Sequence, residues 1–466
     1  MTSKTIAREA WVPDLGAAGK PVYLAVADAI ADDLRSGRLA PGSRLPPQRE
    51  LAAVLGVDLT TVTRAYAEAR RRGLVSATVG RGTFVGLAPA GLAYGVPSGA
   101  PVDMTMNMPP PFQDEAVARA MWSGFDSLQR KQGLQLFLRY QDPGGSADDR
   151  AAGAAWLAER APGLDPSRTL VSAGAQPALV AVLAALANRG DAICCEALAY
   201  PGLRAAAAHL GLAVIGLPMD EQGLVPSELA RVCRDVGPKA VCCTPTLQNP
   251  TTATMSLARR DDLVRVARRF RLPIVEDDAY GRLPERPEPS LASLAPELTW
   301  HIAGLAKLAS PAMRLAYVAA PAARAAGQVG ANLRAVSGMA SPILAALATR
   351  WIESGLMPRI LGAIREETRI RRRIAAEALG AWASEPADAF HLWLRLPPPW
   401  TRAAFQSELQ ARDISVVPSD AFATTGQPPE AVRVGLGAAA SRADLARALG
   451  AMAEVLGQRP SYGTYV

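Results

Sequence analysis

Lys307 is the residue whose type and surroundings most clearly suggest chemistry. It stands in the stretch HIAGLAKLASPAMR, residues 301–314, among small apolar residues. The chain has only five lysines among its 50 Lys and Arg residues, so a lysine here is not the default choice of a basic residue. A desolvated lysine amine can lose its proton and attack a carbonyl carbon, which Arg cannot do. A snorkelling or ion-paired lysine is the alternative.

Other polar residues stand just after predicted strands, where α/β proteins place ligand groups. Gly174, Ala175 and Gln176 open a predicted helix, and their free amides suit a phosphate or form an ordinary helix start. Tyr200 follows another strand and could stack on a planar ring. Four more candidates share such positions or lie close to Lys307 in sequence: Asn249, Tyr280, Arg314 and Arg433.

Asp277 and Asp278 are adjacent carboxylates at the end of a predicted strand. Neighbouring residues of an extended chain point in opposite directions, so the two cannot easily bind one ion, and the three widely spaced histidines offer little support. We therefore expect no metal site. One of the two acids facing a cationic ring nitrogen is the better interpretation.

The elements that must position these residues alternate between strands and helices from about residue 165. Strands are predicted in TLVSAG, DAICCEA, LAVIGLP, AVCCTP and LPIVEDD, with helices between them. This order predicts an α/β domain with a mostly parallel central sheet. The cysteines in these strands are expected to be buried, reduced thiols.

The first 85 residues predict a different module. The spacing of Val22, Val26, Ile30 and Leu34 predicts a first helix with one apolar face. A second helix is predicted in RLPPQRELAAVLG, with Leu51, Val54 and Leu55 facing the core. A third is predicted from 59 to 72, with Val62, Ala65 and Tyr66 facing the core. The segment LVSATVGRGTFV then predicts two short strands around a turn. This is the order of a winged helix-turn-helix, whose second motif helix enters the major groove of DNA.

Charge favours the same interpretation. Residues 1–85 hold twelve Lys and Arg and eight Asp and Glu, which gives +4 of the total formal charge of +7. Arg64, on the polar face of 59–72, and Arg81, at the wing tip, could contact bases or phosphates, although a solvated helix face is the alternative. No signal peptide or apolar stretch of membrane-spanning length is evident, so we expect a cytoplasmic protein.

The module also resembles a known DNA-binding family. The run PGSRLPPQRELAAVLGVDLTTVTRAYAEARRRGLVSATVGRGTFV resembles the GntR-family DNA-binding domain. The resemblance implies contacts to double-stranded DNA from the positions of Arg44, Arg49, Thr61, Thr63 and Arg81. Leu59 stands where that family often has Arg, so the preferred DNA sequence is expected to differ.

Residues from about 104 to 450 resemble fold-type I PLP-dependent aminotransferases through SAGAQ, YPG, QNPTT, EDDAYG and GLAKLASPAMRLAY, in family order. The resemblance implies that Lys307 forms a Schiff base with pyridoxal 5′-phosphate (PLP). It places Asp277 on the ring nitrogen, Asn249 and Tyr280 near the ring hydroxyl, and Tyr200 on the ring. It further assigns the phosphate to Gly174, Ala175, Gln176 and Arg314, and the carboxylate of an amino acid to Arg433.

Together the two modules resemble the MocR subfamily of bacterial transcriptional regulators. The expected organisation is a winged helix-turn-helix at 15–85, a linker at 86–103 and an aminotransferase-like domain with a smaller C-terminal α+β subdomain at 104–466. The resemblance implies a domain-swapped homodimer that senses an amine or amino acid through aldimine exchange at Lys307. The alternative is an active PLP aminotransferase with a residual DNA-binding module. Ala306 and Ala312 replace the family's usual Ser and Gly, which is expected to weaken phosphate binding.

Overall fold

The computed structural model describes residues 11–15, 21–36, 38–39, 43–72, 74–78, 82–85, 101–383 and 388–458. The chain divides into two compact units, residues 1–93 and 94–466. Most of the predicted linker, 86–100, lies outside the described residues, whereas Val102 and Asp103 at its end form a strand of the larger unit.

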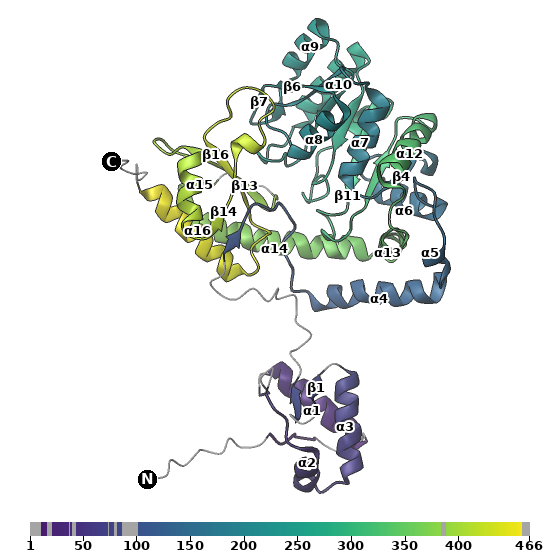
Figure 1. Ribbon diagram of the computed structural model, residues 1–466, viewed down its shortest axis with the longest axis vertical. Helices are drawn as coiled ribbons and strands as arrows, with labels where there is room; N and C mark the ends of the chain where they lie inside the picture. The colour runs from purple at the N-terminus through teal and green to yellow at the C-terminus, as the bar shows by residue number, and fades with distance from the viewer. Residues whose placement is uncertain are drawn as a thin grey trace. The chain divides into compact units, whose positions relative to one another are not determined.

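The N-terminal unit is a helix-turn-helix followed by a hairpin, as the sequence predicted (Figure 1). Its elements are α1 (Val22–Ser36), α2 (Gln48–Leu55), α3 (Leu59–Arg71), β1 (Val75–Thr78) and β2 (Gly82–Val85), with β1 and β2 antiparallel. Gly56 ends α2 in the left-handed conformation, and the Asp58 side chain accepts the N–H of Thr60 to begin α3. These two residues make the tight turn between the helices.

The core of this unit forms where α1 and α2 pack on α3. Val26, Ile30 and Leu51 are buried, as are the three residues predicted to face inward on α3. The prediction for Val54 was wrong, because its side chain is 61% exposed. The buried face of α2 is formed by Leu51, Ala52 and the half-buried Leu55. Val54, three positions after Leu51, lies outside that face.

The larger unit is built on a seven-stranded sheet in the order β4-β12-β11-β10-β9-β5-β6. All neighbours in it are parallel except those of β12, which confirms a mostly parallel sheet. Its strands are β4 (Thr169–Ser172), β5 (Ala192–Glu196), β6 (Ala213–Leu217), β9 (Val241–Cys243), β10 (Ile274–Asp277), β11 (Thr299–Gly304) and β12 (Ala316–Ala319).

Helices cover this sheet (Figure 1). Those that follow its strands are α7 (Ala175–Leu186), α8 (Pro201–Leu210), α9 (Pro226–Asp235), α10 (Leu257–Phe270), α11 (Leu291–Leu294) and α12 (Ala323–Ser337). Before the first strand come α4 (Glu115–Gln132), α5 (Gln135–Leu138) and α6 (Ala147–Leu157), and a small hairpin is made by β7 (Met219–Asp220) and β8 (Gly223–Leu224). The five cysteines are buried and free, and burial raises the pKa of Cys194 to about 12, so its thiol stays protonated.

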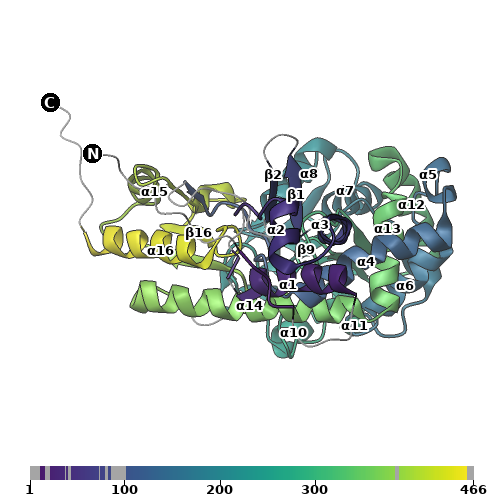
Figure 2. The ribbon, with the colours of Figure 1, turned by 90° about the horizontal axis from the view of Figure 1, so that it is seen from below.

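A smaller α+β layer completes the unit. Its antiparallel sheet has the order β13-β16-β15, and β3 pairs in parallel with β14 beside it. The strands are β3 (Val102–Asp103), β13 (His391–Arg395), β14 (Ile414–Ser415), β15 (Val417–Pro418) and β16 (Ala431–Gly435). Its helices are α14 (Leu356–Leu379), α15 (Arg402–Gln410) and α16 (Arg442–Gly457), whereas α13 (Pro342–Glu353), which precedes α14, packs on α4 and α6 beside the large sheet. Long α14 runs from the region of α13 to lie beside α16 (Figures 1 and 2).

A buried ionic network fixes the end of β10. Glu276 and Asp278 point to the side of the strand opposite Asp277, where His301 of β11 lies 2.9 Å from Glu276 and 3.4 Å from Asp278. Arg160 donates two hydrogen bonds to Asp278, at 2.8 and 3.0 Å. Although burial alone would lower it, the two carboxylates raise the pKa of His301, which favours the protonated ring between them.

Replacement of Arg160 by Ala is expected to destabilise the larger unit by about 3–5 kcal/mol, because Asp278 would keep a buried charge without its partner. The urea unfolding transition of the full chain measures this loss. The matched control is Arg119→Ala, which removes an exposed pair with Glu115 and should leave the transition in place. Equal unfolding midpoints for the two variants would contradict the importance of the network.

Candidate functional site

Lys307 lies in the turn between β11 and β12 and is half-buried. Its amine donates to the main-chain oxygen of Asn107. Burial, and then the positive charge of Arg433, lowers the pKa of Lys307 to about 8, against the opposing charge of Asp277. About a tenth of this amine is therefore neutral, and nucleophilic, at pH 7, far more than of an ordinary lysine.

Asp277 is the last residue of β10 and is the acid that interacts with Lys307. Burial raises the pKa of Asp277 to about 6, while the Ala279 N–H, 3.3 Å away, and the charge of Lys307 act in the opposite direction. Asp278 is instead bound by Arg160. The two adjacent carboxylates thus have separate partners, as their alternation along a strand requires.

Asn107, whose carbonyl accepts from the Lys307 amine, belongs to a network of hydrogen bonds between uncharged side chains. The Asn107 amide lies 2.9 Å from Tyr280 Oη and 3.2 Å from His391 Nδ1. His391 Nε2 faces the carbonyl of Gln248 at 3.4 Å, so it must carry the proton, and Nδ1 accepts from Asn107. Burial lowers the pKa of His391 to about 3 and raises the pKa of Tyr280, so both stay neutral. The Tyr280 hydroxyl accepts from Asn107 and keeps its own proton to donate.

Arg433 is a buried cation on β16. Its Nη1 donates to Asn249 Oδ1 at 2.7 Å, its Nη2 donates to the Thr105 carbonyl at 2.5 Å, and its guanidinium lies over the Phe422 ring at 4.9 Å. Within the described part of the chain it has no carboxylate partner, and its Nε is buried without a hydrogen bond. A buried charge held only by neutral groups is suited to an anionic ligand.

A second anion-binding arrangement lies at the start of α7. Gly174 has φ of +115°, and a Cβ built on it would lie 3.5 Å from Arg314 Nη2. The Arg314 side chain is exposed and makes no hydrogen bond or ion pair with any described residue. Ala175 and Gln176 begin the helix, and Gln176 Oε1 is buried without a partner. Backbone N–H groups and a free guanidinium together suit a phosphate.

These residues fit pyridoxal 5′-phosphate as one set. The unpartnered Arg314 and the glycine-lined helix start suit its phosphate, Asp277 its ring nitrogen, and Asn249 and Tyr280 its ring hydroxyl. Tyr200 interacts electrostatically with Asp277 of this set, because burial and then the negative charge of Asp277 raise the pKa of Tyr200. The structure thus gathers the residues proposed from the sequence around Lys307, although their roles toward the cofactor remain proposals.

Sequence reasoning missed Thr105, Asn107 and His391. All three contact the site through bonds that span more than 100 residues of sequence. The motif MTMNMPPP, residues 104–111, contains the first two, but neither its residue types nor its position after a strand indicates chemistry.

Two of the candidate DNA-binding residues, Arg44 and Arg49, line a groove of about 460 Å³ in the N-terminal unit. It is lined by Arg44, Leu45, Pro46, Pro47, Gln48, Arg49, Leu59, Gly82 and Thr83. The guanidinium groups of Arg44 and Arg49 are without ion pairs among the described residues. The Thr63 hydroxyl lies 2.9 Å from Gln48 Oε1, at the edge of this groove.

The other candidates in this unit lie elsewhere. Arg64 is exposed, but its guanidinium lies 4.4 Å from the ring centre of Tyr23 on α1. Thr61 is half-buried on α3. Arg81 lies outside the described residues, so the structure does not place it. Arg44 and Arg49 are therefore the arginines that the structure presents most directly to a polyanion.

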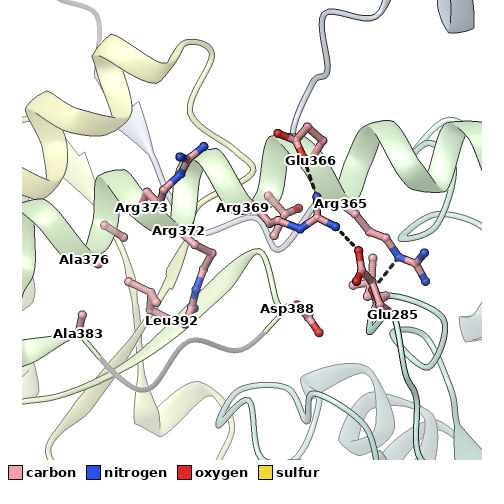
Figure 3. Close-up of a pocket in the computed structure, with 13 residues that line it drawn as sticks. Glu285, Arg365, Glu366, Arg369, Arg372, Arg373, Ala376, Ala383, Asp388 and Leu392 are labelled. Carbon is pink, nitrogen blue, oxygen red and sulfur yellow. Dashed lines mark hydrogen bonds and ion pairs between the residues drawn. The ribbon is translucent and has the colours of Figure 1, made fainter.

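A cavity of about 530 Å³ lies beside α14 (Figure 3). Arg369 is held there between Glu366 and Glu285, and Arg365 donates to main-chain oxygens near Leu283. None of the residues around Lys307 lines this cavity, although Arg372 on its wall donates to the His391 carbonyl at 3.3 Å. The candidate site around Lys307 is therefore separate from this cavity.

Comparison with known families assigns both units. Residues 102–452 match the aminotransferase class I and II family, and residues 22–85 match the gntR family of bacterial regulatory proteins. The uncharacterized HTH-type transcriptional regulator YdeF of Bacillus subtilis (strain 168) is 32% identical over 91% of this chain and 92% of its own length. The chain belongs to the MocR subfamily of GntR-type transcriptional regulators.

Two further relatives of this regulator carry names linked to vitamin B6. The pyridoxine biosynthesis regulator PdxR of Corynebacterium glutamicum is 30% identical over 74% of this chain and 76% of its own length. The vitamin B6 salvage pathway repressor PtsJ of Salmonella typhimurium is 27% identical over 79% of this chain and 84% of its own length. An archaeal alanine:glyoxylate aminotransferase shares the fold, with a TM-score of 0.70 and 22% identity over 78% of this chain and 91% of its own. Among the described residues, no helix is both long and apolar enough to span a membrane.

The lowered pKa of Lys307 predicts how its amine reacts. As pH rises through about 8, acylation of Lys307 by acetic anhydride should increase with the neutral fraction of the amine. Removal of a positive neighbour in Arg433→Met should move the midpoint to higher pH, and removal of a negative one in Asp277→Asn should move it lower.

Peptide mass spectrometry of the full-length apoprotein measures the rate at each lysine, with the half-exposed Lys239 as internal reference. A Lys307 midpoint at the ordinary lysine value, unmoved by either substitution, would contradict the electrostatic description of the site.

Proposed function

We propose that this chain is a PLP-dependent, DNA-binding transcriptional regulator that senses an amine or amino acid through exchange at Lys307. The observation that carries the proposal is the pairing, in one site, of a lysine with a lowered pKa and an arginine without a carboxylate partner. The same chain carries a GntR-type unit, which implies DNA binding.

Bound PLP supplies an aldehyde that joins reversibly to primary amines and a ring that withdraws electrons when its nitrogen is protonated. Lys307 provides the resident amine, and its neutral fraction near pH 8 allows it to be displaced and to return. Asp277 would keep the ring nitrogen protonated. Asn249 and Tyr280 would hold the ring hydroxyl, and Arg314 with the start of α7 would hold the phosphate.

Arg433 defines the effector class. A carboxylate next to an incoming amine would pair with the guanidinium that is now held by Asn249 and Thr105. Charge-assisted bidentate pairing is stronger than the two bonds to neutral oxygens. An amino acid is therefore expected to be favoured over a simple amine, and its differential affinity for two arrangements of the protein would provide the switch.

A homodimer is part of the proposal. Large apolar side chains on α4, on α5 and in the residues flanking α5 are exposed, with Trp122 at 73% and Tyr140 at 95%. The others are Phe125, Leu134, Phe137 and Leu138. Monomeric soluble proteins rarely expose such a surface, so a second copy of the chain, arranged head to tail as in the family, is the proposed partner.

Lys307→Ala should abolish the PLP adduct that borohydride fixes in the wild-type protein, because only a primary amine forms that bond. Mass spectrometry of the reduced full-length chain locates the adduct, and Lys239→Ala is the matched control that should retain it. An adduct of equal yield in Lys307→Ala would refute the assignment. Sustained turnover of amino acids with a keto acid would favour the alternative, an active aminotransferase.

Arg49→Ala should weaken binding to duplex DNA and reduce the slope of log K against log salt by about 1, because one phosphate contact is lost. Fluorescence anisotropy at several salt concentrations measures this slope. Arg231→Ala, an exposed arginine of the larger unit paired with Glu228, makes the same change in net charge and should leave it unchanged. Identical slopes for both variants would exclude Arg49 from the DNA interface.

A further inference from the structure

One short segment contacts both cations of the proposed site. We call residues Val102–Met108 the strap, and its first two residues are the last two of the predicted linker, 86–103. The Thr105 carbonyl accepts from Arg433, and the Asn107 carbonyl accepts from Lys307. The group that would pair with an effector's carboxylate and the amine that an effector's nitrogen would displace are thus held by main-chain oxygens two residues apart.

The strap lies directly on the C-terminal layer. Val102 N–H donates to Asp413 O, Met104 N–H donates to Ser415 O, and Gly435 N–H donates to Met104 O, all at 2.8 to 2.9 Å. A Cβ on Gly435 would lie 2.6 Å from Met106 O, and one on Gly437 would collide with Met108 O. Glycine at these two positions is what allows the strap backbone to reach Arg433 and Lys307.

The side chain of Asn107 holds the strap to the other side of the site. Its amide donates to Tyr280 and to His391, while its Oδ1 is buried without a partner among the described residues. This residue therefore ties the strap to β13 and to the residue proposed to face the ring hydroxyl. The strap therefore contacts Arg433, Lys307 and Tyr280 at the same time.

Occupation of the site competes with these bonds. Lys307 has fewer N–H donors once its nitrogen is joined to a carbon, and Arg433 prefers a carboxylate to a peptide oxygen. The carbonyls of Thr105 and Asn107 would then be buried without their donors, which is unfavourable unless the strap moves.

From this arrangement we propose that the strap is the element that transmits occupation of the site to the DNA-binding unit, because it is continuous with the linker. Asn107 acts in it as a positioning residue. The inference rests on the proposed function, in that Lys307 and Arg433 must be the groups that ligands engage.

Hydrogen exchange of the full-length protein, with and without PLP, tests the proposal. When Lys307 carries PLP, the amides of Val102, Met104 and Gly435 should exchange about tenfold faster, the scale of one lost hydrogen bond. An adduct on Lys307 with unchanged exchange at these three amides would overturn the strap proposal and leave the proposed function standing. Failure to form any adduct at Lys307 would overturn the proposed function, and the strap's role with it.

Two substitutions loosen the strap without replacing Lys307 or Arg433. Gly437→Ala pushes it from β16, and Asn107→Ala removes its ties to Tyr280 and His391. In both, the three amides should exchange rapidly even without PLP. The affinity for a duplex selected from a random pool by the full-length protein should no longer change when PLP is added.

Gly450→Ala in α16 is the matched control, because a Cβ there meets no atom within 4 Å. It should keep both the exchange response and the DNA response of the wild type. If the DNA affinity of the wild type did not change when Lys307 carries an adduct, the proposal that the strap transmits occupation of the site would be overturned. A full DNA response in Asn107→Ala or in a folded Gly437→Ala would overturn it too.

Discussion

The balance of charge around Lys307 is the constraint on which the larger unit depends. A lysine amine and a buried arginine share one site with a single nearby carboxylate, Asp277. With Arg314 as a further positive charge, the cations outnumber this carboxylate, which leaves the lysine partly neutral and leaves Arg433 to neutral oxygens. Such a site is costly without ligands, and the missing negative charge is what a phosphorylated cofactor and a carboxylate effector would supply.

The fold keeps this imbalance from being neutralised internally. Three acidic residues follow one another at the end of β10, but the alternation of a strand sends Glu276 and Asp278 away from Lys307. There Arg160 and His301 bind them. On the other side, burial keeps His391 and Tyr280 neutral, so these two side chains bring no charge to the amine.

Much of this could be predicted from the sequence, because short motifs after strands place their residues at one edge of a parallel sheet. Lys307, Asp277 and Asn249 were found in that way. The two helices of the DNA-binding motif followed from periodicity, although Val54 was wrong because an eight-residue helix leaves its apolar arc poorly defined. Asn107 and His391 carried no local signal, since their roles arise only when distant segments meet.

A crystal structure of the full-length protein with PLP, alone and with an amino acid, tests the central claim most directly. We expect electron density continuous from Lys307 Nζ to the cofactor, Arg314 on the phosphate and Asp277 on the ring nitrogen. With an amino acid bound, Arg433 should leave the Thr105 carbonyl for the carboxylate. A cofactor bound elsewhere, with Lys307 still on the Asn107 carbonyl, would contradict the claim.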